Sequence, residues 1–345
     1  MSNTTTVLFI GDPHFQISNL VDVNLFIPEV VKLATARSPD LILIAGDLLH
    51  THERLHTTVL NKAYEFIDEM RKITKTYVLV GNHDYVSNTQ FLTNNHWMNS
   101  LKEWANLEII DSVKDMTHNG NRFVLVPYVY PGRFAEAIAT ETDSVRSAAC
   151  LFAHQEFKGC KMGAIESVVG DEWGRDMPLV VSGHIHSKQR PQPNVYYPGT
   201  PMQIAFGESE NNIVPLLTFT DGKLAREIEE IPLDLPGKCI LYMDTDALCD
   251  YELEGEDKVR ITLSGDHSEF KSIKQTKKYK DLVESGVKIV FKANKEQDRE
   301  QRTDISATDF MEVLNTMVTS ERSVALMTAY DRIVHNKEAS DVFFL

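Results

Sequence analysis

Five short apolar runs, each followed at once by side chains that can bind a metal ion, most constrain how this chain can fold. The runs span residues 7–10, 41–44, 77–80, 151–153 and 179–181. A short apolar run bounded by turn residues is typical of a buried strand, and ligands of open α/β sheets collect beyond the carboxyl ends of the strands. We therefore expect five strand ends to meet around one site.

The side chains that follow these runs form one set of donors. Its members are Asp12, His14, Asp47, His50, Asn82, His83, Asp84, His154, His184 and His186. Carboxylate and amide oxygens combined with imidazole nitrogens suit Mn²⁺, Fe²⁺ or Zn²⁺ and not Ca²⁺. One carboxylate can bridge two such ions at roughly 3.5–4 Å, and the pair then neutralises a phosphate ester and activates a water molecule. The set predicts phosphoester hydrolysis that requires no nucleophilic side chain.

Each motif is weak evidence when taken singly, because a lone histidine is more often a hydrogen-bonded structural residue than a ligand. The ordered set is specific, since every one of its motifs follows an apolar strand. Outside the set we keep the structural interpretation for the remaining histidines, which are His52, His56, His96, His118, His267 and His335.

The spacing of apolar residues predicts helices over residues 21–37 and 57–73, between the first three strands. This β-α-β-α-β order with nearly continuous apolar strands is typical of a parallel sheet covered on both faces. Further helices are predicted over residues 91–104 and 132–140, and further strands over 107–110, 123–127, 195–201 and 213–220. The pattern indicates an α/β fold.

Changes in pattern divide the chain into three parts. Residues 1–232 carry the metal-ligand motifs, residues 233–296 have the pattern of a small α+β module, and residues 297–345 have the pattern of a polar linker followed by two apolar-faced helices. The module carries a basic group that either binds nucleic-acid phosphates or is a solvated helix face: Lys271, Lys274, Lys277 and Lys278. The helices either bind a partner or dock back on the main domain, and their candidate contact residues are Phe310, Leu314, Met317, Leu326 and Tyr330.

The formal net charge of −15 is the wrong sign for a protein that holds nucleic acid over its whole surface. A polyanionic substrate would need a local basic patch, metal ions or a partner. The polar N-terminus lacks the segments of a signal peptide, and no apolar run approaches the ~20 residues of a membrane span. We expect a cytoplasmic protein, in the host cytoplasm if phage-encoded, whose four widely spaced cysteines are reduced and mostly buried.

Several motifs resemble those of the calcineurin-like metallophosphoesterases. They are Gly11-Asp12-Pro13-His14, Gly46-Asp47, Gly81-Asn82-His83-Asp84, His154 and Gly183-His184-Ile185-His186. Narrower features resemble the SbcD-type recombination nucleases, including phage or viral members: His50, the Ala153-His154-Gln155 triplet and Tyr197-Pro198-Gly199-Thr200-Pro201-Met202. These motifs cover about the first two hundred residues, and the likeness beyond Pro232 is architectural.

The resemblance implies a sandwich of two mixed sheets flanked by helices, with a small α+β cap and a C-terminal helical segment. It also implies the ligands: Asp12, His14 and His186 for one metal, Asn82, His154 and His184 for the other, and Asp47 as the bridge. His83 would protonate the leaving oxygen, Asp84 would orient the His83 imidazole, and His50 would help to place the substrate phosphate. Manganese is the implied metal, with magnesium as the alternative.

The resemblance further implies two protein partners. One is an SbcC-type SMC-like ATPase bound through the C-terminal helices, and the other is a second copy, in a homodimer formed by helices within residues 57–104. The expected function is a manganese-dependent DNA nuclease subunit, a double-strand exonuclease and single-strand endonuclease for recombination, replication, repair and end processing. The alternative is a phosphatase or small-molecule phosphodiesterase with the same metal core, which would require neither His50 nor the cap and tail. A scaffold without chemistry is disfavoured by the full ligand set.

Overall fold

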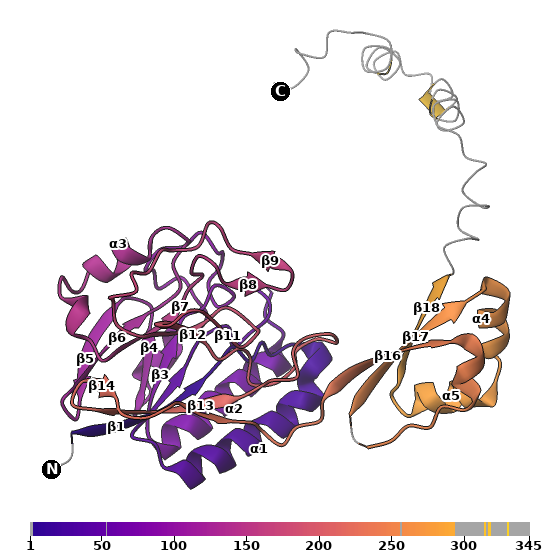
Figure 1. Ribbon diagram of the computed structural model, residues 1–345, viewed down its shortest axis with the longest axis horizontal. Coiled ribbons are helices and arrows are strands. Elements are labelled where there is room, and N and C mark those ends of the chain that lie inside the picture. The colour runs from indigo at the N-terminus through magenta and orange to yellow at the C-terminus, as the bar shows by residue number, and fades with distance from the viewer. Residues whose placement is uncertain are drawn as a thin grey trace. The chain divides into compact units, whose positions relative to one another are not determined.

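The computed structural model describes residues 3–52, 54–255, 257–293, 314, 317, 318 and 330. These residues form two units, drawn in Figure 1. The first comprises residues up to 240 together with 254–259, and the second comprises residues 241–253 and the described residues from 260 onward. The first unit thus continues past Pro232, where the sequence pattern changes, and includes the first residues of strand β16 (Lys238–Asp244).

The first unit contains two mixed sheets. The first sheet has the order β14-β13-β1-β2-β3-β4, with β15 also paired to β13. Its strands are β1 (Thr4–Ile10), β2 (Leu41–Ile44), β3 (Lys75–Leu79), β4 (Leu107–Ile110), β13 (Val214–Thr220), β14 (Lys223–Leu224) and β15 (Glu229–Ile231). Strands β1 to β4 are parallel to one another, and β13 is antiparallel to β1.

The second sheet has the order β11-β12-β10-β7-β6-β5. Its strands are β5 (Lys114–His118), β6 (Asn121–Val126), β7 (Cys150–His154), β10 (Val180–Gly183), β11 (Gln189–Gln192) and β12 (Val195–Tyr197). The four inner strands are parallel, and the two edge strands are antiparallel to their neighbours. A separate short hairpin is formed by β8 (Lys161–Met162) and β9 (Ile165–Glu166).

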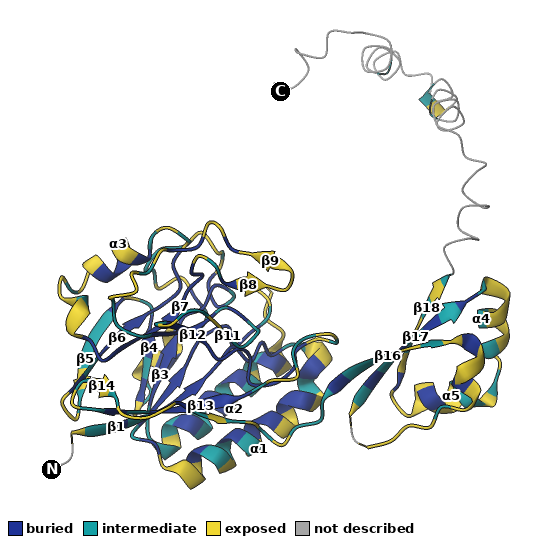
Figure 2. Ribbon diagram, in the orientation of Figure 1, coloured by how far each residue is buried: buried dark blue, intermediate teal, exposed yellow. Residues whose placement is uncertain are grey.

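Alternation along the strands produces four layers. In β1, Leu8 and Ile10 pack with helices α1 (Leu20–Arg37) and α2 (Thr57–Ile73), whereas Val7 and Phe9 pack with the second sheet. The outer face of the second sheet packs with α3 (Phe134–Ala139). Figure 2 shows the central strands of the two large sheets as mostly buried and the outer faces of the helices as exposed. This arrangement confirms the predicted α/β sandwich, because successive side chains of a strand point to opposite faces.

Residues 91–104 do not form the predicted helix. They form turns and the short 3₁₀ helix η2 (Asn99–Glu103). The apolar residues in this stretch serve different cores: Phe91 packs with the second sheet and α3, whereas Trp97 and Trp104 pack with α2. Their spacing therefore does not mark one helix face. Other 3₁₀ helices are η1 (Ile17–Asn19), η3 (Val145–Ser147) and η4 (Thr245–Cys249).

The second unit is a small α+β module. Its sheet has the order β16-β17-β18, with β17 (Lys258–Gly265) parallel to β18 (Lys288–Ala293). Helices α4 (His267–Ile273) and α5 (Lys277–Glu284) connect the parallel pair. Phe270 of α4 stacks on Phe291 of β18, with ring centroids 4.5 Å apart. This stacked pair joins the helical layer to the sheet.

All four cysteines are free thiols, as predicted. Cys150 and Cys160 are buried, but Cys239 is half-buried and Cys249 is exposed, so the expectation of mostly buried thiols is right for only two of them. Within the described residues, no helix has the length and apolar character needed to cross a membrane.

Candidate metal centre

The five predicted strand ends meet at one place in the first unit. Strands β1, β2 and β3 of the first sheet are mutually parallel, as are β7 and β10 of the second sheet. Because parallel strands end at the same edge of a sheet, their following loops come together. His154 is the last residue of β7, and the other candidate ligands lie in the loops just beyond the remaining strands.

The candidate ligands form two groups. In one group, the amide oxygen of Asn82 lies 3.0 Å from Nε2 of His154 and 2.8 Å from Nδ1 of His184. In the other group, Nε2 of His14 and Nε2 of His186 are 2.9 Å apart. The family resemblance implies the same grouping of these residues, with one group for each metal.

The carboxylate of Asp47 lies between the two groups. Its Oδ2 is 3.6 Å from Nε2 of His14 and 3.4 Å from Nε2 of His154. Its Oδ1 accepts a hydrogen bond of 2.7 Å from the backbone N–H of His83. One side chain therefore contacts a residue of each group, which is the position that a bridging ligand must take.

The donor set fits two divalent cations. Oδ1 of Asp12 and Nδ1 of His14 are buried and make no hydrogen bond to any described residue. Buried polar atoms are normally partnered, because leaving them without a partner costs free energy. Three overlapping trios of residues each have donor atoms within 4.8 Å of one another. They are Asp12 with His14 and Asp47, Asp47 with His154 and His184, and His14 with His50 and His83. Oxygen and imidazole donors at this spacing suit Mn²⁺, Fe²⁺ or Zn²⁺.

Burial and neighbouring charges shift the pKa values of this cluster in opposite directions. Burial raises the pKa of Asp12 to about 6, although the nearby His154 acts to lower it. Burial opposes ionisation of Asp47 too, but His154 and His14 hold the Asp47 pKa well below its usual range. Burial would lower the pKa of His154, but the two carboxylates raise it to about 9. The cluster thus holds Asp47 as an anion, the form that binds a metal.

The backbone at three candidate ligands adopts a left-handed conformation. The φ angles are 45° at His14, 46° at Asp47 and 80° at His184. Such conformations cost of order 1–3 kcal/mol each at non-glycine residues and persist where the surrounding structure holds them. Here the backbone N–H of His14 donates a hydrogen bond of 3.0 Å to the carbonyl of Asp47, so the loops after β1 and β2 hold each other.

Two motif glycines leave room for ligand carboxylates. A Cβ atom at Gly81 would lie 2.2 Å from Oδ1 of Asp47, and one at Gly183 would lie 2.3 Å from Oδ1 of Asp12. Both distances are far below ordinary contact, so a larger residue would displace the carboxylate. Gly81 and Gly183 therefore allow the carboxylates of Asp47 and Asp12 to pack directly against the backbone of these two motifs.

His83 lies beside the candidate ligands, and its ring is oriented by a backbone carbonyl and not by the expected carboxylate of Asp84. Its Nδ1 is 2.7 Å from the backbone carbonyl oxygen of His50. The prediction that Asp84 orients the His83 ring is wrong. Oδ1 of Asp84 accepts a hydrogen bond from Trp97 Nε1, and Oδ2 accepts one from the N–H of Gly81, because the carboxylate folds back over its own turn.

His50 lies within the same cluster of rings. Its ring centroid is 5.5 Å from that of His83 and 5.4 Å from that of His14. Burial, followed by the neighbouring His83, lowers the pKa of His50. The side chain is therefore next to both the candidate ligand His14 and His83.

Sequence reasoning missed three residues at this site. The ring of His52 stacks on His83, with centroids 4.5 Å apart. Oε1 of Glu208 lies 3.4 Å from Nδ1 of His186, and the ring of Tyr128 is 5.7 Å from that of His184. Tyr128 follows strand β6, so the strand-end pattern that found the other residues could have found it.

Gln155, Tyr197 and Thr200, which belong to the motifs that resemble SbcD-type nucleases, make hydrogen bonds next to the candidate ligands. The side chain of Gln155 is buried and donates a hydrogen bond of 2.7 Å to Asp171, while its carbonyl accepts one from the Tyr197 hydroxyl. The N–H of Thr200 donates to the carbonyl of His186 at 3.0 Å. In this structure these residues make structural hydrogen bonds and fix the strand ends.

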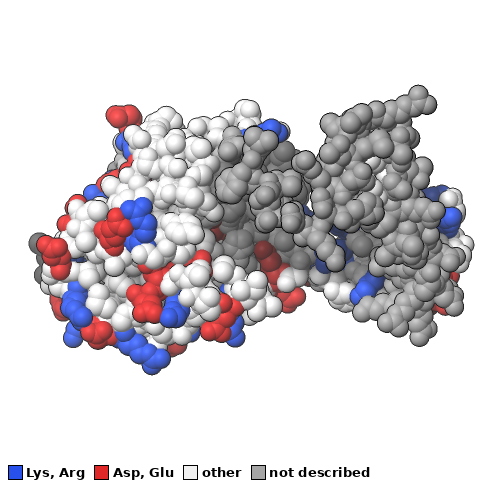
Figure 3. Space-filling model, turned by 90° about the horizontal axis from the view of Figure 1, so that it is seen from above, with Lys and Arg blue, Asp and Glu red and all other residues white. Residues whose placement is uncertain are grey.

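The described members of the predicted DNA-binding and partner-binding sets all lie in the second unit. Lys271, Lys274 and Lys277 are exposed, whereas Lys278 is half-buried, with its Nζ 3.9 Å from Glu252. Leu314, Met317 and Tyr330 are helical, and Met317 is exposed. Phe310 and Leu326 lie outside the described residues. On the visible face of the first unit, Figure 3 shows acidic and basic side chains interspersed.

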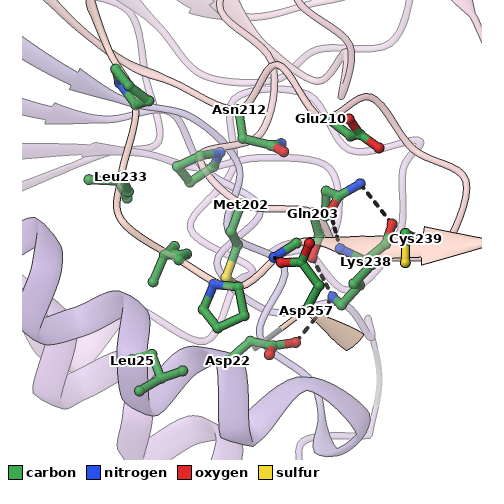
Figure 4. Close-up of a pocket in the computed structure, with 15 residues that line it drawn as sticks. Asp22, Leu25, Met202, Gln203, Glu210, Asn212, Leu233, Lys238, Cys239 and Asp257 are labelled. Atoms are coloured by element: carbon green, nitrogen blue, oxygen red, sulfur yellow. Dashed lines mark hydrogen bonds and ion pairs between the residues drawn. The ribbon is translucent and has the colours of Figure 1, made fainter. Parts of the chain in front are cut away.

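Two cavities lie within the first unit. One of 480 Å³ is lined by His184, His186 and Glu208 and so opens beside the candidate ligands. The other, of 220 Å³, is shown in Figure 4. At its wall Lys238 is buried, with its Nζ 3.1 Å from both Oδ2 of Asp22 and the carbonyl of Ile204. These contacts connect helix α1 to the first residue of β16, so this second cavity is a structural junction.

Comparison with known proteins agrees with this geometry. Residues 5–188 match the family described as Calcineurin-like phosphoesterase. The chain belongs to this family. It is 47% identical over 296 residues to "Putative phosphoesterase 078R" of Invertebrate iridescent virus 3, covering 84% of this chain and 85% of that one. It is 48% identical over 280 residues to the corresponding 244L protein of Invertebrate iridescent virus 6, covering 79% of this chain and 98% of that one. The protein is thus a metallophosphoesterase, a metal-binding hydrolase with relatives in iridescent viruses.

Proposed function

We propose that this calcineurin-like phosphoesterase is a manganese-dependent DNA nuclease subunit. The observation that carries the hydrolytic part of this proposal is the position of His83, which contacts the shared carboxylate through its backbone but lies outside the two ligand groups. Asp12, His14 and His186 would hold one ion, Asn82, His154 and His184 the other, and Asp47 both. When bound, the two ions neutralise the phosphate oxygens and lower the pKa of a bound water.

The hydrogen bond of His83 defines its protonation chemistry. A carbonyl oxygen only accepts, so Nδ1 of His83 carries the proton that faces His50. Nε2 makes no hydrogen bond to a described residue and is available to the substrate. In the neutral ring Nε2 has only a lone pair, so His83 donates a proton to the leaving oxygen only as the imidazolium. His50 is beside it to contact the same phosphate group.

Features outside the centre support DNA as the substrate. Lys271, Lys274 and Lys277 form an exposed basic group in the second unit. The net charge of −15 implies that this group alone does not hold a duplex, so we also propose an SbcC-type SMC-like ATPase partner and a homodimer. Truncation from Ser306 onward tests the partner: the expected result is loss of ATPase binding with retained metal-dependent hydrolysis.

A phosphatase or small-molecule phosphodiesterase is the second candidate. The cavity of 480 Å³ beside His184 and His186 favours it, because small-molecule sites commonly enclose about 300–1,000 Å³. The viral relatives are named only as phosphoesterases, which fits either candidate.

One assay separates the two candidates. Purified full-length protein is incubated with linear double-stranded DNA, single-stranded DNA or a generic phosphomonoester, in Mn²⁺, Mg²⁺ or chelator, with His83→Ala as control. Cleavage of DNA in Mn²⁺ that is lost in the variant supports the nuclease. Turnover of the monoester with intact DNA overturns the nuclease and supports the phosphatase.

A further inference from the structure

We propose that His52 is a positioning residue that holds the His83 imidazole in its reactive orientation; this inference rests on the proposed role of His83. The two rings are nearly parallel, with centroids 4.5 Å apart and planes inclined by 16°. Aromatic pairs at this separation and angle are in contact and resist displacement. His52 lies in the segment between β2 and α2, two residues after His50.

The other contacts of His83 do not by themselves fix the orientation of its ring. The hydrogen bond from Nδ1 to the carbonyl of His50 fixes one edge of the ring but allows the ring to swing about that bond. The ring of His14 meets His83 edge-on, at 5.0 Å and 90°. A ring stacked on a face blocks the remaining motion. His52 is closer to that role than His50, whose nearly parallel ring lies 5.5 Å away.

His52 does not behave as an ordinary structural histidine. Such a residue is buried with its ring nitrogens hydrogen-bonded, as His96 is, with Nε2 3.1 Å from Asp111. In contrast, Nδ1 of His52 is buried and makes no hydrogen bond to a described residue. The structure places this ring on the face of His83, so we propose a positioning role in place of the structural interpretation given to His52 from the sequence.

The test compares three variants of the full-length protein: His52→Ala, His52→Phe and, as matched control, His56→Ala. His56 lies on the same segment and is exposed. We expect His52→Ala to lower kcat by about three- to tenfold, the worth of one aromatic pair, with little change in KM or in Mn²⁺ affinity. His52→Phe keeps a stacking ring and should recover most of the rate, while His56→Ala should match the wild type.

A double-mutant cycle shows whether His52 acts through His83. In a His83→Ala background, His52→Ala should cause no further loss, because the ring that it positions is gone. Equal losses in the Ala and Phe variants, an additive loss in the cycle, or a parallel fall in Mn²⁺ affinity would each overturn the proposal.

A readout that needs no turnover separates this inference from the proposed function. In metal-free protein, the imidazole NMR signals of His83 should shift or broaden in His52→Ala and return toward the wild-type positions in His52→Phe. If the His83 signals of His52→Ala match those of the wild type, the positioning role is wrong. This conclusion holds even if the wild-type protein hydrolyses DNA as proposed. If the wild type cleaves monoester and not DNA, the DNA assignment fails, and the same kinetic comparison is then made on the monoester.

Discussion

Adding one methyl group at Gly81 tests whether the packing of this loop sets the position of Asp47. The new Cβ would lie 2.2 Å from Oδ1 and 2.4 Å from the backbone nitrogen of Asp47. Gly81 is not among the residues with positive φ, so the cost of Gly81→Ala comes from contact alone. Overpacking of this kind typically costs about 1–3 kcal/mol.

The displacement matters more than the lost stability. Ordinary contact begins at 3.4 Å, so the carboxylate must move by about 1.2 Å from its 2.2 Å separation. Metal-ligand distances tolerate only about ±0.2 Å. The same movement lengthens the hydrogen bond that Oδ1 of Asp47 accepts from His83. We therefore expect Gly81→Ala to lose at least about tenfold in Mn²⁺ affinity and to hydrolyse substrate poorly.

Calorimetric titration with Mn²⁺ measures the affinity, and thermal unfolding in chelator measures the stability. A cost of about 1–3 kcal/mol lowers Tm by about 2–12 °C in a domain of this size. Gly222→Ala is the matched control, because its φ is +76° and nothing lies within 4 Å of the added Cβ. It should carry backbone strain but bind Mn²⁺ normally. A Gly81→Ala protein with wild-type Mn²⁺ affinity would refute this reasoning.

Three further predictions follow from the structure. His83→Ala should retain Mn²⁺ and lose most hydrolysis, because His83 is outside the two ligand groups; equal loss of both in titration and rate assays would contradict this. Asp47→Ala should lose binding of both ions. It should therefore also lose the rise in unfolding free energy that bound metal confers, which is about 2.7 kcal/mol for each ion at one hundred times its Kd, measured with and without chelator. The hydrogen bond from Arg122 lowers the pKa of Asp115, so this carboxylate stabilises the fold above the ordinary value of about 3.9 and loses that effect as pH falls below it. The stability difference between wild type and Asp115→Asn, measured in chelator, should therefore vanish in acid; a difference that persists there would contradict the assignment.

The strands at the metal centre could be predicted because they are buried on both faces and so form unbroken apolar runs. Strand β5 (Lys114–His118) was missed because it is a polar edge strand of the second sheet. The helix predicted over residues 91–104 failed because its aromatic residues belong to different cores.

The side chains at the strand ends could be identified from residue type and order, but their contacts could not. Nothing in the Gly81-Asn82-His83-Asp84 motif shows that Asp84 folds back to Trp97, since that contact depends on how the irregular segment 85–98 returns to the site. The stacking of His52 on His83 likewise depends on a loop conformation without a periodic signal. Tertiary packing decides both.

The junction around Asp22 makes the first unit difficult to separate from the rest of the chain. Asp22 on α1 pairs with Lys238 and with Lys258, the first residues of β16 and β17. A fragment ending at Pro232 would leave this buried carboxylate without either lysine, and loss of one partner of a buried pair typically costs 3–5 kcal/mol. A stable minimal hydrolase must therefore include residues 238–240 and 254–259 joined by a short linker, because the two lysines reach the same aspartate from separate stretches of the chain.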